Sequence, residues 1–192
     1  MKKNKKGFTL VELLASLVIL GLLTAIAAPN IIGIVESSRN NTYIEDAKKL
    51  ATLAEYRLRS DSNVKRPANT KSIVMSMDYL GTSEFKNSPY QSKKGEYMHG
   101  EDTMYSFVVI KNNGGKYEYY VQLIEKYPSG KKDSAGNDIY SYRGIKAQPV
   151  KGINSSSIIN YNSLSQLSKV NSTTMTVTTK GGAINSITDR YV

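Results

Sequence analysis

The sequence predicts an α+β fold, in which a long N-terminal helix, hydrophobic in its first half and amphipathic in its second, packs on an antiparallel β-sheet head domain. Three observations lead to this prediction. Residues 7–35 form one apolar stretch, residues 36–60 carry apolar side chains at helical spacing, and the chain beyond residue 100 alternates β-rich segments with turn signals. A helix followed by a run of strands is typical of the α+β class.

The apolar stretch 7–35 exceeds the roughly 20 helical residues that cross a membrane. A cleaved secretory signal peptide is one alternative, but its apolar core is only about 7–15 residues long. Ala25-Ile26-Ala27 is a weak match to the cleavage site of such a peptide. A basic flank before the stretch predicts a cytoplasmic N-terminus with the rest of the chain outside. That flank consists of Lys2, Lys3, Lys5 and Lys6.

Glu12 is the only charged side chain between Lys6 and Glu36. An ionisable group at bilayer depth costs about 2.5–3.5 kcal/mol on insertion scales, and such groups usually serve a function. A plain membrane anchor explains the length of the stretch but gives Glu12 no role. Because buried charges are normally paired, the sequence predicts a positive partner for this carboxylate.

The run Lys6-Gly7-Phe8-Thr9-Leu10-Val11-Glu12 resembles the prepilin signature of type IV pilins and pseudopilins. In that family a dedicated membrane peptidase cuts after the glycine, on the cytoplasmic side, and methylates the new N-terminus. The resemblance implies cleavage after Gly7 and N-methylation of Phe8. It covers residues 2–30 as a motif, and the rest of the chain matches only in architecture, which is that of the type IV pilin fold.

The same resemblance implies assembly roles for Glu12 and Thr9. The amine that cleavage creates on Phe8 of an incoming subunit would pair with Glu12 of a neighbour and set the axial step between subunits. Gly21 and Pro29 match the positions between which the helix of the family loosens in the filament. Both residues disfavour a helix, since proline lacks a backbone donor and glycine lowers helix propensity by about 1 kcal/mol.

Four segments follow from this interpretation: a cytoplasmic leader removed by the prepilin peptidase (1–7), a transmembrane or filament-core half of the helix (8–35), an amphipathic half packing on the head (36–60), and a globular head with an antiparallel sheet (61–192). The amphipathic half has an apolar stripe at helical spacing. The stripe consists of Ile44, Ala47, Ala51, Ala54 and Leu58, with Leu50 beside it.

Within the head, the sequence predicts a short helix from Thr70 to Leu80 and then strands. Asn112-Asn113-Gly114-Gly115 indicates a tight hairpin turn, because Asn-Gly readily adopts positive φ. Alternation places Tyr117, Tyr119, Val121 and Leu123 on one face, toward the helix. The expected strands are 104–111, 116–126 and 139–142, with a loop at 127–138 and a second hairpin formed by 173–179 and 183–191.

Composition argues against enzymatic chemistry. The chain has no cysteine and a single histidine, His99, which lies in a polar segment and is expected to be a surface residue. No cofactor is expected. Asp133, Asn137 and Asp138 could offer oxygen ligands to calcium, but the spacing and closing glutamate of an EF-hand are missing, so a solvated turn is preferred.

Net charge and the missing cysteines also bear on partners. Without its four leader lysines the net charge falls from +10 to +6, and the remaining basic residues are spread along the chain, so direct nucleic-acid binding is not expected. Many pilins carry a C-terminal disulfide, which this chain cannot form. This departure resembles Gram-positive (clostridial-like) pilins, and it leaves the C-terminal region to be held by the strands of 173–191.

The preferred interpretation is a structural subunit of a type IV pilus that polymerises through its N-terminal helix for adhesion, twitching motility, biofilm formation or DNA uptake. Its partners would be further copies in a helical filament, other pilins, the prepilin peptidase, and the assembly platform and ATPase. The precursor would be a single-pass protein of the cytoplasmic membrane and the product an extracellular pilus. A type II secretion pseudopilin and a non-polymerising membrane protein with a ligand-binding head are the alternatives.

Overall fold

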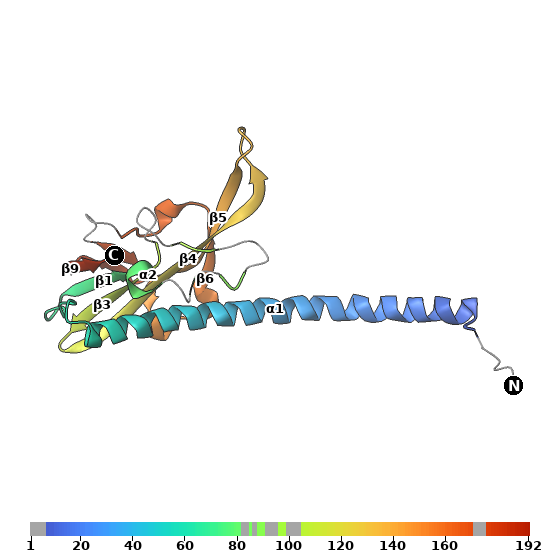
Figure 1. The fold of residues 1–192 in the computed structure, drawn as a ribbon, viewed down its shortest axis with the longest axis horizontal. Helices are drawn as coiled ribbons and strands as arrows, with labels where there is room; N and C mark the ends of the chain where they lie inside the picture. Colours follow the sequence, from blue (N-terminus) through green and yellow to red (C-terminus); the bar gives the residue numbers. More distant parts are fainter. Residues whose placement is uncertain (1–6, 82–84, 86–87, 91–95, 99–104, 171–175) are drawn as a thin grey trace. The chain divides into compact units, whose positions relative to one another are not determined.

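The computed structural model describes residues 7–81, 85, 88–90, 96–98, 105–170 and 176–192. The chain divides into two compact units, Met1–Ser38 and Arg39–Val192. Helix α1 (Leu10–Ser60) contributes residues to both units, and the second unit contains the sheet (Figure 1). The fold is therefore α+β, as the sequence predicts.

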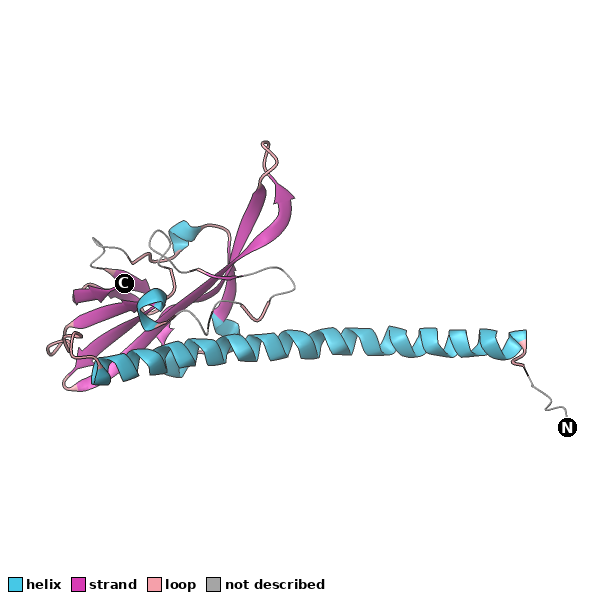
Figure 2. Cartoon of the chain, viewed as in Figure 1, coloured by secondary structure: helices cyan, strands magenta, loops and turns pink. Residues whose placement is uncertain are grey.

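The head contains a seven-stranded sheet with the order β6-β5-β4-β3-β1-β9, to which β2 adds by pairing with β4 (Figure 2). All of its strand pairs are antiparallel except β1 with β9. The strands are β1 (Ser72–Ser76), β2 (Glu96–Tyr97), β3 (Phe107–Asn113), β4 (Lys116–Lys132), β5 (Asp138–Pro149), β6 (Ile158–Tyr161) and β9 (Ile187–Tyr191), and a separate hairpin joins β7 (Val177–Thr179) to β8 (Gly182–Ile184). Short helical turns complete the unit: α2 (Met77–Leu80), η3 (Val150–Gly152), η4 (Ser155–Ser157) and η5 (Leu164–Gln166).

One face of the sheet packs against the C-terminal half of α1. The predicted stripe of this helix is buried, and Ala47 and Ala54 are fully inaccessible, so their small side chains let the helix lie close to the strands. Val121 and Leu123 of β4 belong to the same core, with Tyr117 and Tyr119 packed at its edge. Both the stripe and the inward face of β4 are thus confirmed.

The opposite face of the sheet is covered by the C-terminal part of the chain. Val74 of β1 and Val109 of β3 meet Val177 of β7 and Ile184 of β8 in a second core. In β1 and β3 the side chains alternate between the two cores, since Ile73 and Met75 belong to the helix-side core. Packing on this second face stabilises the C-terminal region in a chain that has no disulfide.

Two sequence predictions in the head are wrong. The helix expected from Thr70 to Leu80 is instead the strand β1 followed by the single turn α2, because all five side chains of β1 are buried between two cores. Thr70 does not cap a helix; it has a positive φ of 64°. The loop expected at 127–138 is mostly strand, because β4 continues to Lys132 through an irregularity between Pro128 and Lys131.

Two further expected strands differ from the prediction. The strand expected at 139–142 continues to Pro149. The second hairpin is present, but it turns at Lys180-Gly181, one residue earlier than expected, and 183–191 is not one strand. Its first part is β8, and its last part is β9, which pairs in parallel with β1 and so departs from a purely antiparallel sheet. His99 and residues 173–175 lie outside the described residues.

Candidate processing and assembly site

The first turn of α1 holds Thr9 and Glu12 in a reciprocal cap. The Thr9 N–H donates to Glu12 Oε2 at 2.8 Å, and the Glu12 N–H donates to Thr9 Oγ1 at 3.3 Å. The Thr9 hydroxyl lies 2.9 Å from the same carboxylate oxygen. This is a capping box, in which two otherwise unsatisfied donors of the helix end are paired. The cap gives Glu12 polar partners within its own chain.

The other described hydroxyls of the apolar stretch are also satisfied locally. Ser16 Oγ donates to the Glu12 carbonyl at 2.7 Å, and Thr24 Oγ1 donates to the Leu20 carbonyl at 2.8 Å. Such bonds to the preceding turn hide a hydroxyl from an apolar environment. Among the described residues of the apolar stretch 7–35, Glu12 is therefore the one that would bring a charge into an apolar medium.

Around this carboxylate the helix is covered by exposed apolar side chains. Phe8 is 87% exposed, Leu10 is 79% exposed and Val11 is 74% exposed, and apolar side chains farther along the helix, such as Ile26, are exposed as well. Within the described part of the chain, α1 is the one helix that is long and apolar enough to cross a membrane. Exposing an apolar surface of this extent to water is unfavourable, so we expect lipid or other protein to cover it.

The residues expected to be processed precede the helix. Gly7 and Phe8 precede the helix without regular secondary structure, and no heavy atom lies within 4 Å of the position that a Cβ of Gly7 would take. Both residues of the expected cleavage site are therefore exposed within the described part of the chain. Gly21 and Pro29 lie inside α1, which is continuous through both positions in this single chain. Their loosening in a filament stays a prediction.

The head contains a polar cluster that the sequence did not reveal. The side chain of Glu125 is fully buried and pairs with Arg143, whose Nε lies 2.8 Å from Glu125 Oε1. The Ser88 hydroxyl donates to the other oxygen of this carboxylate, and the Arg143 guanidinium lies 3.5 Å from the ring centre of Tyr90. Removing one partner of such a buried pair usually destabilises a protein strongly.

Tyrosines fix the amphipathic half of α1 to this cluster. The Tyr43 hydroxyl donates to the Leu123 carbonyl at 2.9 Å, and the Tyr97 hydroxyl donates to Asp46 Oδ2 at 2.6 Å. Burial raises the pKa of both tyrosines, and burial also raises the pKa of Asp46. The Tyr43 hydroxyl also approaches Gly144 closely. These contacts depend on the pairing of β4 with β5, in which Glu125 lies opposite Arg143. Local sequence patterns do not specify that pairing.

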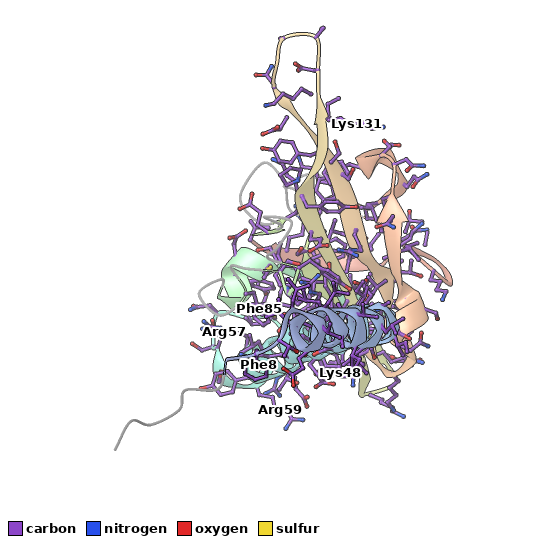
Figure 3. All side chains as sticks on the ribbon, turned by 90° about the vertical axis from the view of Figure 1, so that its right-hand side faces the viewer. Phe8, Lys48, Arg57, Arg59, Phe85 and Lys131 are labelled. Atoms are coloured by element: carbon purple, nitrogen blue, oxygen red, sulfur yellow. The ribbon has the colours of Figure 1, made fainter. Side chains whose placement is uncertain are left out.

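The calcium candidate lies in the turn between β4 and β5. Asp133 Oδ1 accepts hydrogen bonds from the N–H groups of Asn137 and Ala135, at 2.8 and 2.9 Å, and the Asn137 side chain donates to Oδ2. These bonds, led by that from Asn137, lower the pKa of Asp133. Lys132 Nζ lies 3.2 Å from Asp138. Lys131 lies on the same hairpin, where it extends beyond the rest of the sheet (Figure 3).

Millimolar calcium is expected to leave the melting temperature of the protein unchanged, because the turn already uses its carboxylates for protein contacts. Thermal denaturation with and without calcium, compared with magnesium as a control, tests this. A calcium-specific rise in melting temperature that Asp133→Ala removes would identify a metal site.

Comparison with known proteins agrees with the geometry of the N-terminus. Residues 2–28 match the family model of the prokaryotic N-terminal methylation motif. No curated protein matches the chain, and no solved structure matches it. The match supports no assignment to Gram-positive bacteria, which stays a prediction from the missing cysteines.

The motif has direct consequences for the biology of the chain. It implies processing by a prepilin peptidase and pilus-like assembly, and together with the apolar helix it indicates membrane anchoring and secretion. Proteins with this motif are typically structural subunits and not enzymes. The chain is thus a type IV pilin-like or pseudopilin-like protein, and its N-terminal segment belongs to the prokaryotic N-terminal methylation motif family, the prepilin-type sequences that are cleaved and methylated.

Proposed function

We propose that the chain is a structural subunit of a type IV pilus and polymerises through its N-terminal helix into a filament on the cell surface. The observation that carries the proposal is Glu12, a carboxylate on the first turn of a helix whose neighbouring side chains are apolar and exposed. The helix cap alone would be served equally well by an uncharged glutamine, whereas an assembly of helices can use the charge of Glu12.

Cleavage after Gly7 would create a positive amine on Phe8, and methylation would leave it positive. In the membrane the Thr9–Glu12 cap supplies hydrogen bonds to the carboxylate but no opposite charge. An incoming subunit would bring its Phe8 amine to Glu12 of a neighbour and neutralise it. The pairing is favourable because a charge in an apolar medium gains most from a close opposite charge.

We propose a separate role for each successive segment of the chain. Residues 1–7 keep the N-terminus cytoplasmic and are removed, residues 8–35 form first a transmembrane and then a filament-core helix, and residues 36–60 attach this helix to the head at 61–192. We propose that the helix loosens between Gly21 and Pro29 in the filament. The assembly platform and ATPase would drive polymerisation, and the filaments would serve adhesion, twitching motility, biofilm formation or DNA uptake.

Electron microscopy of sheared surface filaments, combined with mass spectrometry of their subunits, tests the proposal. We expect abundant peptides of this chain that begin at N-methylated Phe8. Absence of the chain from surface filaments, with processed protein retained at the membrane, would favour a secretion pseudopilin. An unprocessed monomeric protein would contradict assembly altogether. Loss of regular helix between Gly21 and Pro29 in a reconstruction of the same filaments tests the loosening.

A further inference from the structure

A groove lies in the head where β5 leaves the sheet. β4 pairs with β3 from Lys116 to Gln122, but its pairing with β5 begins only at Tyr120. On that side, the edge of β4 from Lys116 to Tyr119 therefore has no strand partner among the described residues. A cavity of 460 Å³ follows this edge and is lined by Ala51 and Thr52 of α1 and by 149–151 at the end of β5.

The walls of the groove suit an extended chain. An edge strand presents alternating N–H and C=O groups, and a peptide that lies alongside can bond to them in the spacing of a sheet. The side chains of Ala51 and Thr52 are small and leave room between helix and strand, while Tyr117 and Tyr119 supply apolar surface. The free edge of four residues is about 13 Å long, enough for a short segment of strand.

The charges of the groove favour an acidic occupant. Glu55 already pairs with Arg59, and Lys48, which projects from the helix in Figure 3, pairs with Glu45. Two further lysines of the lining, Lys116 and Lys151, have no ion-pair partner within the described part of the chain. The lining also contains Glu118, which accepts a hydrogen bond from the Tyr120 hydroxyl at 3.3 Å. Lys48, Lys116 and Lys151 thus stand against Glu55 and Glu118, which leaves the lining with one excess positive charge.

We propose that the groove between α1 and the free edge of β4 binds an extended acidic peptide segment of another protein, which adds to β4 as a short strand. The strand edge supplies specificity for a polypeptide, and Lys116 and Lys151 supply attraction for its carboxylates. The groove lies within the head, so peptide binding and filament assembly can succeed or fail independently.

The test uses the full chain in detergent micelles and a fluorescein-labelled peptide, Glu-Val-Thr-Val-Glu-Val, followed by fluorescence anisotropy. We expect saturable binding that weakens as salt is added. Thr52→Trp fills the groove from an exposed helix position and is expected to weaken binding about tenfold, whereas Thr52→Ala is expected to retain it. Circular dichroism confirms that each variant is folded.

Charge and backbone recognition are tested separately. Lys116→Glu combined with Lys151→Glu is expected to weaken binding about tenfold, while Lys180→Glu, an exposed lysine in the turn between β7 and β8, leaves it unchanged. The same peptide with alternate backbone nitrogens methylated is expected not to bind, because it cannot form the strand bonds. Equal binding of the methylated peptide, equal competition by the acidic polysaccharide polygalacturonate, or no binding to folded wild-type protein would each overturn the proposal.

Discussion

Replacing Gly144 with alanine is expected to destabilise the head by about 3–5 kcal/mol, enough to unfold much of it at ordinary temperature. A Cβ at this position would collide with the Leu123 carbonyl oxygen, lie 2.6 Å from the Tyr43 hydroxyl, and lie 2.9 Å from the Ile124 Cα. Two of these three atoms belong to the backbone of the neighbouring strand. The strand pair β4–β5 would have to separate to admit the methyl group.

Urea denaturation of the full chain in detergent, followed by near-ultraviolet circular dichroism of its buried tyrosines, measures this effect. Gly152→Ala is the matched control, because no heavy atom lies within 4 Å of the Cβ that it would add. We expect that control to change stability by less than about 0.5 kcal/mol. Similar midpoints for the two variants would show that the sheet tolerates the methyl group and that the close approach at Gly144 is not needed.

Tyr43 provides a further check on the cause. Tyr43→Phe removes the hydroxyl and its hydrogen bond to the Leu123 carbonyl, and we expect the backbone collisions to remain in the double variant with Gly144→Ala. The second substitution is therefore not expected to rescue the first. The Tyr43 contact fixes the point at which the amphipathic half of α1 rests on β4 and β5.

Local patterns in the sequence predicted those elements whose cause is local. The stripe from Ile44 to Leu58 repeats at the period of a helix, and Gly114-Gly115, both with positive φ, form the predicted turn between β3 and β4. The prediction of a helix at 70–80 was wrong because β1 is buried on both faces. Its sequence therefore lacks the alternation of apolar and polar residues that marks a strand with one exposed face. The prediction of a loop at 127–138 was wrong because it relied on Pro128 and Gly130, which are typical of loops. Pairing with β5 extends the strand β4 past both residues.

The candidate sites show the same division between local and long-range causes. The spacing Thr9-x-x-Glu12 is itself the pattern of a capping box, so the cap at the helix start was accessible from the sequence. The pair Glu125–Arg143 and the approach of Tyr43 to Gly144 join residues far apart along the chain. They depend on the strand register, which three-dimensional packing sets and no short motif contains.

Replacing Glu12 with alanine is expected to leave membrane insertion and cleavage intact while reducing surface filaments by at least about a hundredfold. Insertion should improve, since the substitution removes a group that costs about 2.5–3.5 kcal/mol in the bilayer. Assembly should fail because the Phe8 amine of each added subunit would be buried without an opposite charge. Breaking a buried ion pair costs about 3–5 kcal/mol, and each 1.4 kcal/mol is a factor of ten in affinity.

Two further variants separate the ion pair from the helix cap. Glu12→Gln keeps an acceptor for the Thr9 N–H but carries no charge, whereas Thr9→Val removes the hydroxyl of the cap and keeps the charge. If the charge directs assembly, Glu12→Gln should lose filaments like Glu12→Ala, and Thr9→Val should keep most of them. Leu13→Ala, one residue farther along the exposed apolar surface, is the control for lost packing.

The measurement is an immunoblot of sheared surface filaments against the membrane fraction, with mass spectrometry of the N-terminus. Processed Glu12→Ala protein that accumulates in the membrane is the expected result. Wild-type filament yield from this variant would contradict the proposed pairing with Phe8. If Thr9→Val lost filaments and Glu12→Gln kept them, the carboxylate would act mainly through its own helix cap, and the register between subunits would have to come from apolar packing.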